Sequence, residues 1–461
     1  MIYSYIPRSS PIFADLAYVS IFVDLRRSCY LLNDMKAGTL DGMKAGALDG
    51  IPTDRYQDIN ARAFGYAVIL NRRQSFNIRL KSGVPSMSLG SVIVNNLDLS
   101  QGLPSAVECL FLFSGVVASA PEADKIHSVN MSTDLDNILG TEDSVLKTQV
   151  EAARANGGQN WFAYVYPAST STDMMFKIDY ALSDVSVEAV VHCDPVANTA
   201  DLEAMQSTAM TIMSKYQRRV FFIAAFRGPT QDESWSDYAT TAKGVTDGVA
   251  ADRVMVVPQL YPHFQGALAG RLANKAVSVA DSPIRVANGS LVGSYASRPT
   301  DNIGMVLNKS LLLDLHNNGR FTVPTWYEDY DGTYTSDGFT LAPETSDYRV
   351  IENLRVADKA ARRIYLLAVA RIGNRLLNST PKSIAFNSTY FMKPLRQMAH
   401  GVEINGIPFP GEIEPPKAGD IVISWKTKYA VDIYFSLRPM NCPKDITANI
   451  TLDLNNYAEA A

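Results

Sequence analysis

Between residues 107 and 280, short apolar runs of β type alternate with longer segments of helical periodicity. The predicted strands lie at 107–118, 161–167, 186–192, 219–225 and 253–257. The predicted helices lie at 135–156, 199–217, 232–247 and 264–280. Strands that alternate with helices at this spacing predict βαβ units and a mostly parallel sheet. The chain is therefore expected to belong to the α/β fold class, with helices flanking the sheet.

The longest helical pattern covers residues 347–382. Its apolar residues recur at steps of three and four, which places them on one stripe: Ile351, Leu354, Ala357, Ala361, Ile364, Ala368 and Ile372. Its other sides carry charged residues, namely Glu352, Arg355, Lys359, Arg362 and Arg363. Asp358 is spaced to pair with Arg362, and Gly373 and Pro381 are expected to stop the helix. We interpret it as the helix that packs a C-terminal domain and leaves its charged side for a partner.

Composition narrows the class of protein. At 461 residues the chain is long enough for two or three domains, and 47% hydrophobic with 19% charged residues indicates a globular protein. A net charge of −5 argues against direct binding of nucleic acid. Four widely spaced cysteines without a C-x-x-C pair predict a reducing compartment and no zinc site. No apolar run approaches the roughly 18 residues of a membrane span, so we expect a cytosolic protein without membrane insertion.

The first 86 residues differ from the rest of the chain. Two near-identical octamers, 35–42 and 43–50, follow each other directly and indicate a local duplication, because solenoid repeats are longer and more numerous. From Met87 the pattern changes, with a partly alternating strand at 89–99. Our hypothesis is that Met87 is the natural start, or that residues 1–86 form an extension outside the fold.

The C-terminal part mixes turns, helices and strands. Two Asp-Gly pairs, at 331–332 and 337–338, predict hairpin turns. A helix with a bend at Pro394 is expected at 383–400, and strands are expected at 421–425, 430–438 and 446–454. The expected domains are an extension (1–86), an N-terminal arm (87–105), an α/β domain (106–300), a C-terminal core domain (301–440) and a C-terminal arm (441–461).

Motifs that carry chemistry are scarce. Gly266 and Gly270 resemble a phosphate loop only in their spacing, because the Lys-Ser/Thr pair is missing, and a closely packed helix is the better interpretation. The five histidines are isolated, and the adjacent pair His192 and Cys193 is better explained by burial than by catalysis. We therefore predict no catalytic residue, no metal site and no cofactor.

Several stretches together resemble the contractile tail sheath proteins of bacteriophages, in the branch related to Mu-type phages and contractile injection systems. The residues that carry the resemblance lie at 156–165, 270–283, 350–364, 390–398, 411–413, 433–434, 438–439 and 449–454, with Val92, Asn95 and Leu97 before them. The resemblance extends from about Met87 to Leu454, and no single motif in it is decisive. Their order and number make it specific.

The resemblance implies a structural subunit without enzymatic activity. In this family, six-fold rings of subunits stack helically around a rigid tail tube, and contraction drives the tube through the host envelope without nucleotide hydrolysis. The implied partners are further copies of the chain, the tail tube protein, the baseplate and the tail terminator. The implied location is the virion tail, assembled in the host cytoplasm.

The resemblance also implies terminal arms that add strands to the sheets of neighbouring subunits. By position the arms here are 89–99 and 446–454, with the apolar residues Leu89, Val92, Val94, Leu97, Ile446, Ile450, Leu452 and Leu454. Strand addition would satisfy the backbone groups of an otherwise exposed terminal strand. Pairing of each arm within its own sheet is the open alternative. Charged C-terminal residues touch the tube in related sheaths, and the candidates here are Arg355, Lys359, Arg362 and Arg363.

Two other classes of protein compete with the sheath interpretation. An α/β enzyme could assemble its site from residues scattered along the chain. A ligand-binding module could use the aromatic and acidic segment 326–334, where Glu328, Asp329 and Asp331 could also hold a cation, although a solvated hairpin tip explains these three more simply. Electron microscopy would separate the three, because only a sheath forms tubules or stacked rings.

Overall fold

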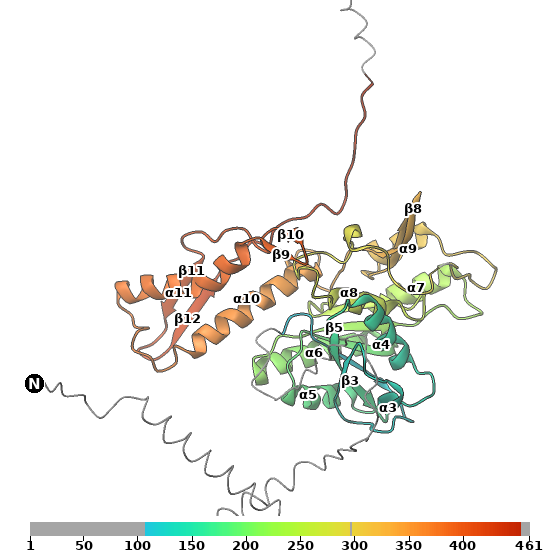
Figure 1. Ribbon diagram of the computed structural model, residues 1–461, viewed down its shortest axis with the longest axis horizontal. Helices are drawn as coiled ribbons and strands as arrows, with labels where there is room; N and C mark the ends of the chain where they lie inside the picture. The colour runs from blue at the N-terminus through green and yellow to red at the C-terminus, as the bar shows by residue number, and fades with distance from the viewer. Residues whose placement is uncertain (1–106, 296, 453–461) are drawn as a thin grey trace, which may run out of the picture. The chain divides into compact units, whose positions relative to one another are not determined.

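The computed structural model describes residues 107–295 and 297–452 (Figure 1). The duplicated octamers, the predicted strand at 89–99 and the arm residues Leu89, Val92, Val94, Leu97 and Leu454 lie outside the described residues. Within the described part, no helix is both long and apolar enough to cross a membrane.

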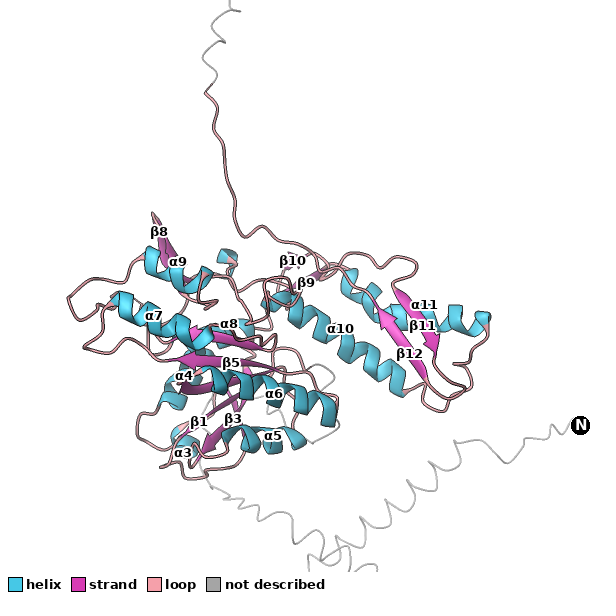
Figure 2. Ribbon diagram, turned by 180° about the vertical axis from the view of Figure 1, so that it is seen from behind, coloured by secondary structure: helices cyan, strands magenta, loops and turns pink. Residues whose placement is uncertain are grey.

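A six-stranded sheet forms the first part of the described chain (Figure 2). Its strands are β1 (Phe111–Val116), β2 (His127–Asn130), β3 (Phe162–Ala168), β4 (Ala189–Val196), β5 (Phe221–Phe226) and β6 (Val254–Pro258), in the order β2-β3-β1-β4-β5-β6. Every pairing is parallel except that of β2 with β3. The predicted α/β class with a mostly parallel sheet is therefore confirmed.

Helices follow the strands and cover the sheet. They are α3 (Asp136–Leu139), α4 (Val145–Asn156), α5 (Met174–Asp184), α6 (Thr199–Tyr216), α7 (Trp235–Thr246) and α8 (Phe264–Leu272). From β1 the chain crosses to β3 on one side and then to β4 on the other, so right-handed crossovers place α4 and α5 on opposite faces. The helix α8 packs against α4, and α6 packs against α5.

Glycines allow the close packing of α8 on α4. A Cβ atom at Gly266 would overlap the carbonyl oxygen of Gln149, and one at Gly270 would overlap that of Ala153. The Gln149 side chain also accepts a hydrogen bond from the Gly266 amide at 2.6 Å. The interpretation of these glycines as packing residues, rather than a phosphate loop, is confirmed.

Several predicted helix boundaries are wrong. The pattern at 135–156 forms two helices, because Gly140 adopts a positive φ of 88° and interrupts the chain between α3 and α4. The helix predicted to end at residue 280 ends at Leu272. The helices α5 and α9 (Lys309–Asn317) were not expected, since at 11 and 9 residues they are too short for a helical period to be distinct.

The predicted hairpin turns are also misplaced. The strands β7 (Pro324–Tyr327) and β8 (Tyr330–Thr335) are joined at Glu328–Asp329, so the Asp331-Gly332 pair lies inside β8. The second Asp-Gly pair, 337–338, is followed by isolated bridges at Phe339 and Leu341 and not by the second strand of a hairpin. The next hairpin turns at Asn405 and Gly406, both with positive φ, between β9 (Val402–Ile404) and β10 (Ile407–Phe409).

The C-terminal part contains two long helices and a further two-stranded sheet. The helices are α10 (Ile351–Val369) and α11 (Pro381–Ala399), and the antiparallel strands are β11 (Ile421–Trp425) and β12 (Val431–Phe435). The predicted helix at 347–382 is therefore too long: α10 ends four residues before Gly373, and Ile372 is 80% exposed rather than part of the apolar stripe. The helix α11 runs through Pro394.

Two hydrophobic cores meet on α10. Its first turns contribute Ile351 and Leu354 to the core of the six-stranded sheet. The following turns contribute Val356, Ala360 and Ile364 to a smaller core with α11 and β11. The helix α10 therefore contributes side chains to both hydrophobic cores.

Candidate functional site

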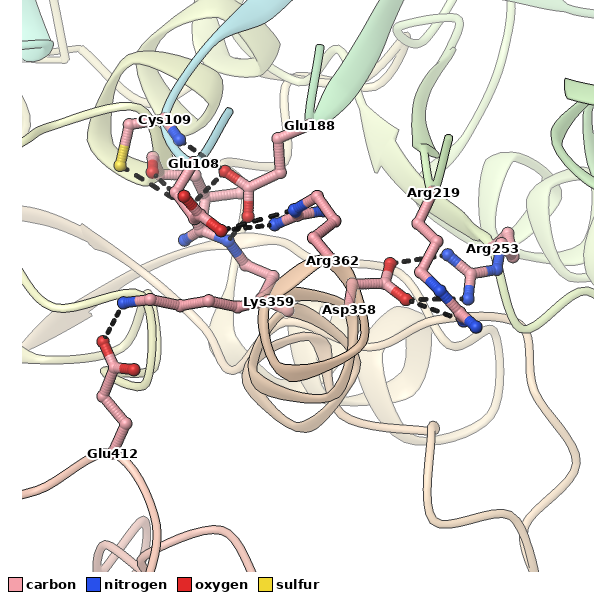
Figure 3. Close-up of polar contacts among 11 residues, drawn as sticks. Glu108, Cys109, Glu188, Arg219, Arg253, Asp358, Lys359, Arg362 and Glu412 are labelled. Atoms are coloured by element: carbon pink, nitrogen blue, oxygen red, sulfur yellow. Dashed lines mark hydrogen bonds and ion pairs between the residues drawn. The ribbon is translucent and has the colours of Figure 1, made fainter. Parts of the chain in front are cut away.

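Arg355, Asp358 and Arg362 of α10 bind residues at the amino ends of the parallel strands. Glu108 and Cys109 precede β1, Glu188 precedes β4, and Arg219 and Arg253 precede β5 and β6. Each of these residues contacts a side chain of α10 (Figure 3). The contacts follow from topology, because parallel strands bring their amino ends to one edge of the sheet.

Arg355 occupies the most buried of these contacts. Its side chain is 3% exposed and donates to the two oxygens of Glu188 at 2.8 and 3.0 Å, and to the carbonyl oxygen of Leu272 at 2.9 Å. Glu188, 1% exposed, also accepts from the Cys109 amide at 2.6 Å. Burial works to raise the pKa of the Glu188 carboxyl, but the charge and hydrogen bonds of Arg355 outweigh it and hold that pKa below its usual range.

Asp358 forms the second buried contact. Arg253 donates to its two oxygens at 2.6 and 3.0 Å, and Arg219 approaches it at 3.5 Å. The predicted pair of Asp358 with Arg362 is wrong, because Asp358 faces the amino ends of β5 and β6. Arg362 instead binds Glu108 at 3.0 Å.

Three of the four predicted tube-facing residues therefore have partners inside the chain. Besides Arg355 and Arg362, Lys359 forms an ion pair with Glu412. The expectation that this side of α10 is free is wrong for these three residues. The helix packs against two cores, so its charged side also faces other parts of the chain. Arg363 is half-buried, and the described part of the chain gives it no ion pair.

One group of exposed basic residues lies where α10, α11 and the β11–β12 turn meet. Arg375 and Lys382 lie in and after the α10–α11 connection, and Lys428 lies in the turn between β11 and β12. All three are exposed, and none forms an ion pair within the described residues. Arg371 and Tyr429 line the same hollow as Arg375 and Lys428. We call Arg371, Arg375, Lys382 and Lys428 the basic end.

The sheet β11–β12 has one buried and one exposed face. Ile421 and Ile423 pack into the second core, whereas Val422 and Tyr434 are 51% and 58% exposed. The sheet has two strands, so neither outer edge is paired with another strand in the described part of the chain. Such edges accept added strands.

The C-terminal segment that follows has no strand of its own within the described residues. The strand predicted at 446–454 is not formed up to residue 452, where the described part ends. Ile446, Ile450 and Leu452 are 78%, 96% and 76% exposed. Apolar residues at alternate positions of an extended segment are typical of a strand that lacks its sheet.

The carboxyl ends of the strands are where α/β enzymes bind ligands. There His192 is buried and contacts Ser114 at 3.3 Å, while Asp194 accepts from the Val116 amide. The amino terminus of α6 is occupied by the capping box of Asn198 and Asp201. Burial raises the pKa of the Cys193 thiol well above its usual range. The burial predicted for His192 and Cys193 is confirmed.

The partners of α10 were missed because they are distant in sequence. Glu108, Glu188, Arg219 and Arg253 are charged residues just before apolar strands, an unusual position for side chains that topology then buries. Opposite charges on α10 and before the strands were the available signal.

Comparison with known proteins identifies the family. Residues 89–339 match the family described as "DUF2586, N-terminal domain", and residues 347–455 match "DUF2586, C-terminal domain". The chain is 42% identical over 376 residues to the "Putative tail sheath protein" of Haemophilus phage HP1 (strain HP1c1). The aligned region covers 80% of this chain and 99% of that protein.

Solved structures share the fold. The cryo-EM structure of the anti-feeding prophage baseplate (TM-score 0.53, 14% identity) and that of its helical sheath in the contracted state (0.52, 15%) each match 80% of this chain and 100% of their own. The resemblance to sheath proteins is thereby confirmed. The chain belongs to the DUF2586 family and to the family of phage tail sheath proteins.

Proposed function

We propose that this chain polymerises in stacked six-fold rings around a tail tube, and that contraction of the polymer drives the tube through the host envelope. The subunit acts as a structural element, without catalysis or a cofactor. Assembly takes place in the host cytoplasm, and the ends of the sheath meet the baseplate and the tail terminator. Support comes from the sheath relatives and from exposed apolar surface on an otherwise well-packed chain.

The proposal rests on two complementary features, namely the exposed terminal segment and the open edges of the sheet β11–β12. Ile446, Ile450 and Leu452 are exposed in a segment without strand partners, and β11–β12 has open edges. Each backbone hydrogen bond of an added strand contributes about 1 kcal/mol net. Strand addition between copies therefore yields a connected lattice without a large flat interface. The arm at 89–99 is proposed to act in the same way.

A matched pair of substitutions tests strand exchange. Ile450→Asp places a charge on the apolar face of the arm, and Thr451→Asp places one on the opposite face. We expect purified wild type and Thr451→Asp to form tubules in electron micrographs, and Ile450→Asp to stay unassembled with an unchanged melting temperature. Tubules of normal length from Ile450→Asp would contradict strand exchange through this arm.

We further propose that the tube contact lies at the basic end, together with Arg363. Arg375, Lys382 and Lys428 are exposed and available for an acidic tube surface. By contrast, Arg355, Lys359 and Arg362 are held by Glu188, Glu412 and Glu108. Surface ion pairs are individually worth about 0–1 kcal/mol, so many such contacts can be released together on contraction.

Charge reversal tests this contact. The triple variant Arg375→Glu, Lys382→Glu and Lys428→Glu should lose salt-sensitive co-sedimentation with tube protein. The control is Lys275→Glu, an exposed lysine after α8. Unchanged, salt-insensitive co-sedimentation of the triple variant would move the tube contact elsewhere.

A further inference from the structure

The C-terminal segment leaves the fold at a defined residue. The amide of Met440 donates to the Glu412 carbonyl oxygen at 3.1 Å, and no later backbone group up to residue 452 forms a hydrogen bond within the described residues. Lys444 is the one side chain of this later segment that forms ion pairs within the described residues, and it forms two. The path of the segment beyond Met440 is therefore held by a single side chain.

Lys444 lies between two buried carboxylates. Its ammonium is 2.6 Å from Asp337 Oδ2 and 2.5 Å from Glu352 Oε1. Asp337 and Glu352 are each 6% exposed, although the lysine comes from a largely exposed segment. Asp337 is fixed in turn by the Ser282 hydroxyl at 2.6 Å and the Gly338 amide at 3.0 Å. We call Asp337, Glu352 and Lys444 the arm anchor.

The two carboxylates depend on the ammonium. Burial and the nearby charge of Asp337 raise the pKa of Glu352, and Lys444 offsets this only in part. The second oxygen of Glu352 is buried without a hydrogen-bond partner in the described part of the chain. Two buried carboxylates at one site repel each other. Without the ammonium of Lys444 this repulsion is uncompensated, so the side chains of Asp337 and Glu352 are expected to move apart.

The arm anchor joins the terminal segment to α10. Glu352 lies in the first turn of α10, about one turn before Arg355 and nearly two turns before Asp358. These two bind Glu188 and Arg253 at the amino ends of β4 and β6. Separate ion pairs on the first turns of α10 thus connect this helix with the start of the terminal arm and with the six-stranded sheet.

We infer that Lys444 is a positioning residue that fixes the start of the C-terminal arm to α10. An arm captured by a neighbouring copy then pulls on α10 and the six-stranded sheet rather than peeling β12 from its hairpin. This inference rests on the proposed strand exchange for its role in the assembled sheath. The fixed position itself is a property of the single chain.

The single chain provides the first test. Spin labels are placed at Asp445→Cys, next to the anchor, and at Leu366→Cys, an exposed position of α10, with Cys29 and Cys442 replaced by serine. Double electron–electron resonance should give a narrow distance distribution in this background and loss of the narrow component on Lys444→Met. The control Lys275→Met should leave it unchanged. A broad distribution before the change, or a narrow one after it, would overturn the inference.

A second variant separates anchoring from charge burial. Lys444→Met combined with Asp337→Asn and Glu352→Gln removes the repulsion as well as the ammonium, so the fold is preserved. The broad distribution should persist in this variant, and recovery of the narrow component would refute the role of Lys444.

Assembly provides the last test. Tubules of Lys444→Met should break to shorter lengths under shear than those of Lys275→Met, and equal lengths would count against the proposed load path. Failure of the wild type to form tubules would count against the proposed function and leave the distance measurement as the test of the anchor.

Discussion

The six-stranded sheet and the sheet β11–β12 differ in how completely their faces and edges are covered within the described residues. In the first, β1, β4, β5 and β6 are almost wholly buried, because helices cover both faces. In the second, one face packs on α10 and α11 while the other face and both edges are open within the described residues. The first region is complete in one chain, and the second has the features of a region completed by other copies.

The helix α10 connects the two regions. It enters both cores, and its charged residues bind the amino ends of the strands in the complete region. Load on the incomplete region therefore reaches the complete one through buried ion pairs, which resist separation better than exposed ones.

Loss of the ion pair between Arg355 and Glu188, which joins α10 to the six-stranded sheet, should have the largest effect on the free energy of unfolding. Arg355→Met leaves the Glu188 carboxylate buried without its cation, which we expect to cost about 3–5 kcal/mol of unfolding free energy. Urea unfolding measures this, with Arg363→Met as the control because Arg363 lacks an internal ion pair in the described chain. Equal losses in the two variants would show that the link is not a major source of stability.

Acid should weaken the same link. The pKa of Glu188 lies below its ordinary value of 4.5 in the folded chain, so the unfolded chain binds more protons as the pH falls. The stabilisation is fully present above about pH 4.5 and is lost as the pH falls through the depressed folded value. Unfolding free energy should therefore fall on acidification, with a shallower slope in Glu188→Gln than in the control Glu203→Gln. Identical slopes would contradict this assignment.

The smallest effect on stability should come from the exposed face of β11. Val422→Ser is expected to change the unfolding free energy by less than about 0.5 kcal/mol while reducing tubule formation. Ile423→Ser, one residue along on the buried face, should cost about 2–5 kcal/mol. A comparable stability loss from both would show that the exposed face is already part of a core.

The alternation of strands and helices was enough to predict the parallel sheet, because each apolar strand is continuous and bounded by turns. The packing role of Gly266 and Gly270 was also predictable, because the Lys-Ser/Thr pair of a phosphate loop is missing. The partners of Arg355 and Asp358 were not, since periodicity within one helix cannot show which distant residues face it. The same limit explains Ile372, which is apolar and in register but lies beyond the end of α10.

The central claim is that the incomplete sheet is completed by the arm of another copy. The most direct measurement is a cryo-EM reconstruction of tubules assembled from this chain, at a resolution that traces the backbone. We expect residues 446–454 to form a strand along an open edge of β11–β12 in a neighbouring subunit. Pairing of this segment with the sheet of its own subunit would contradict the account.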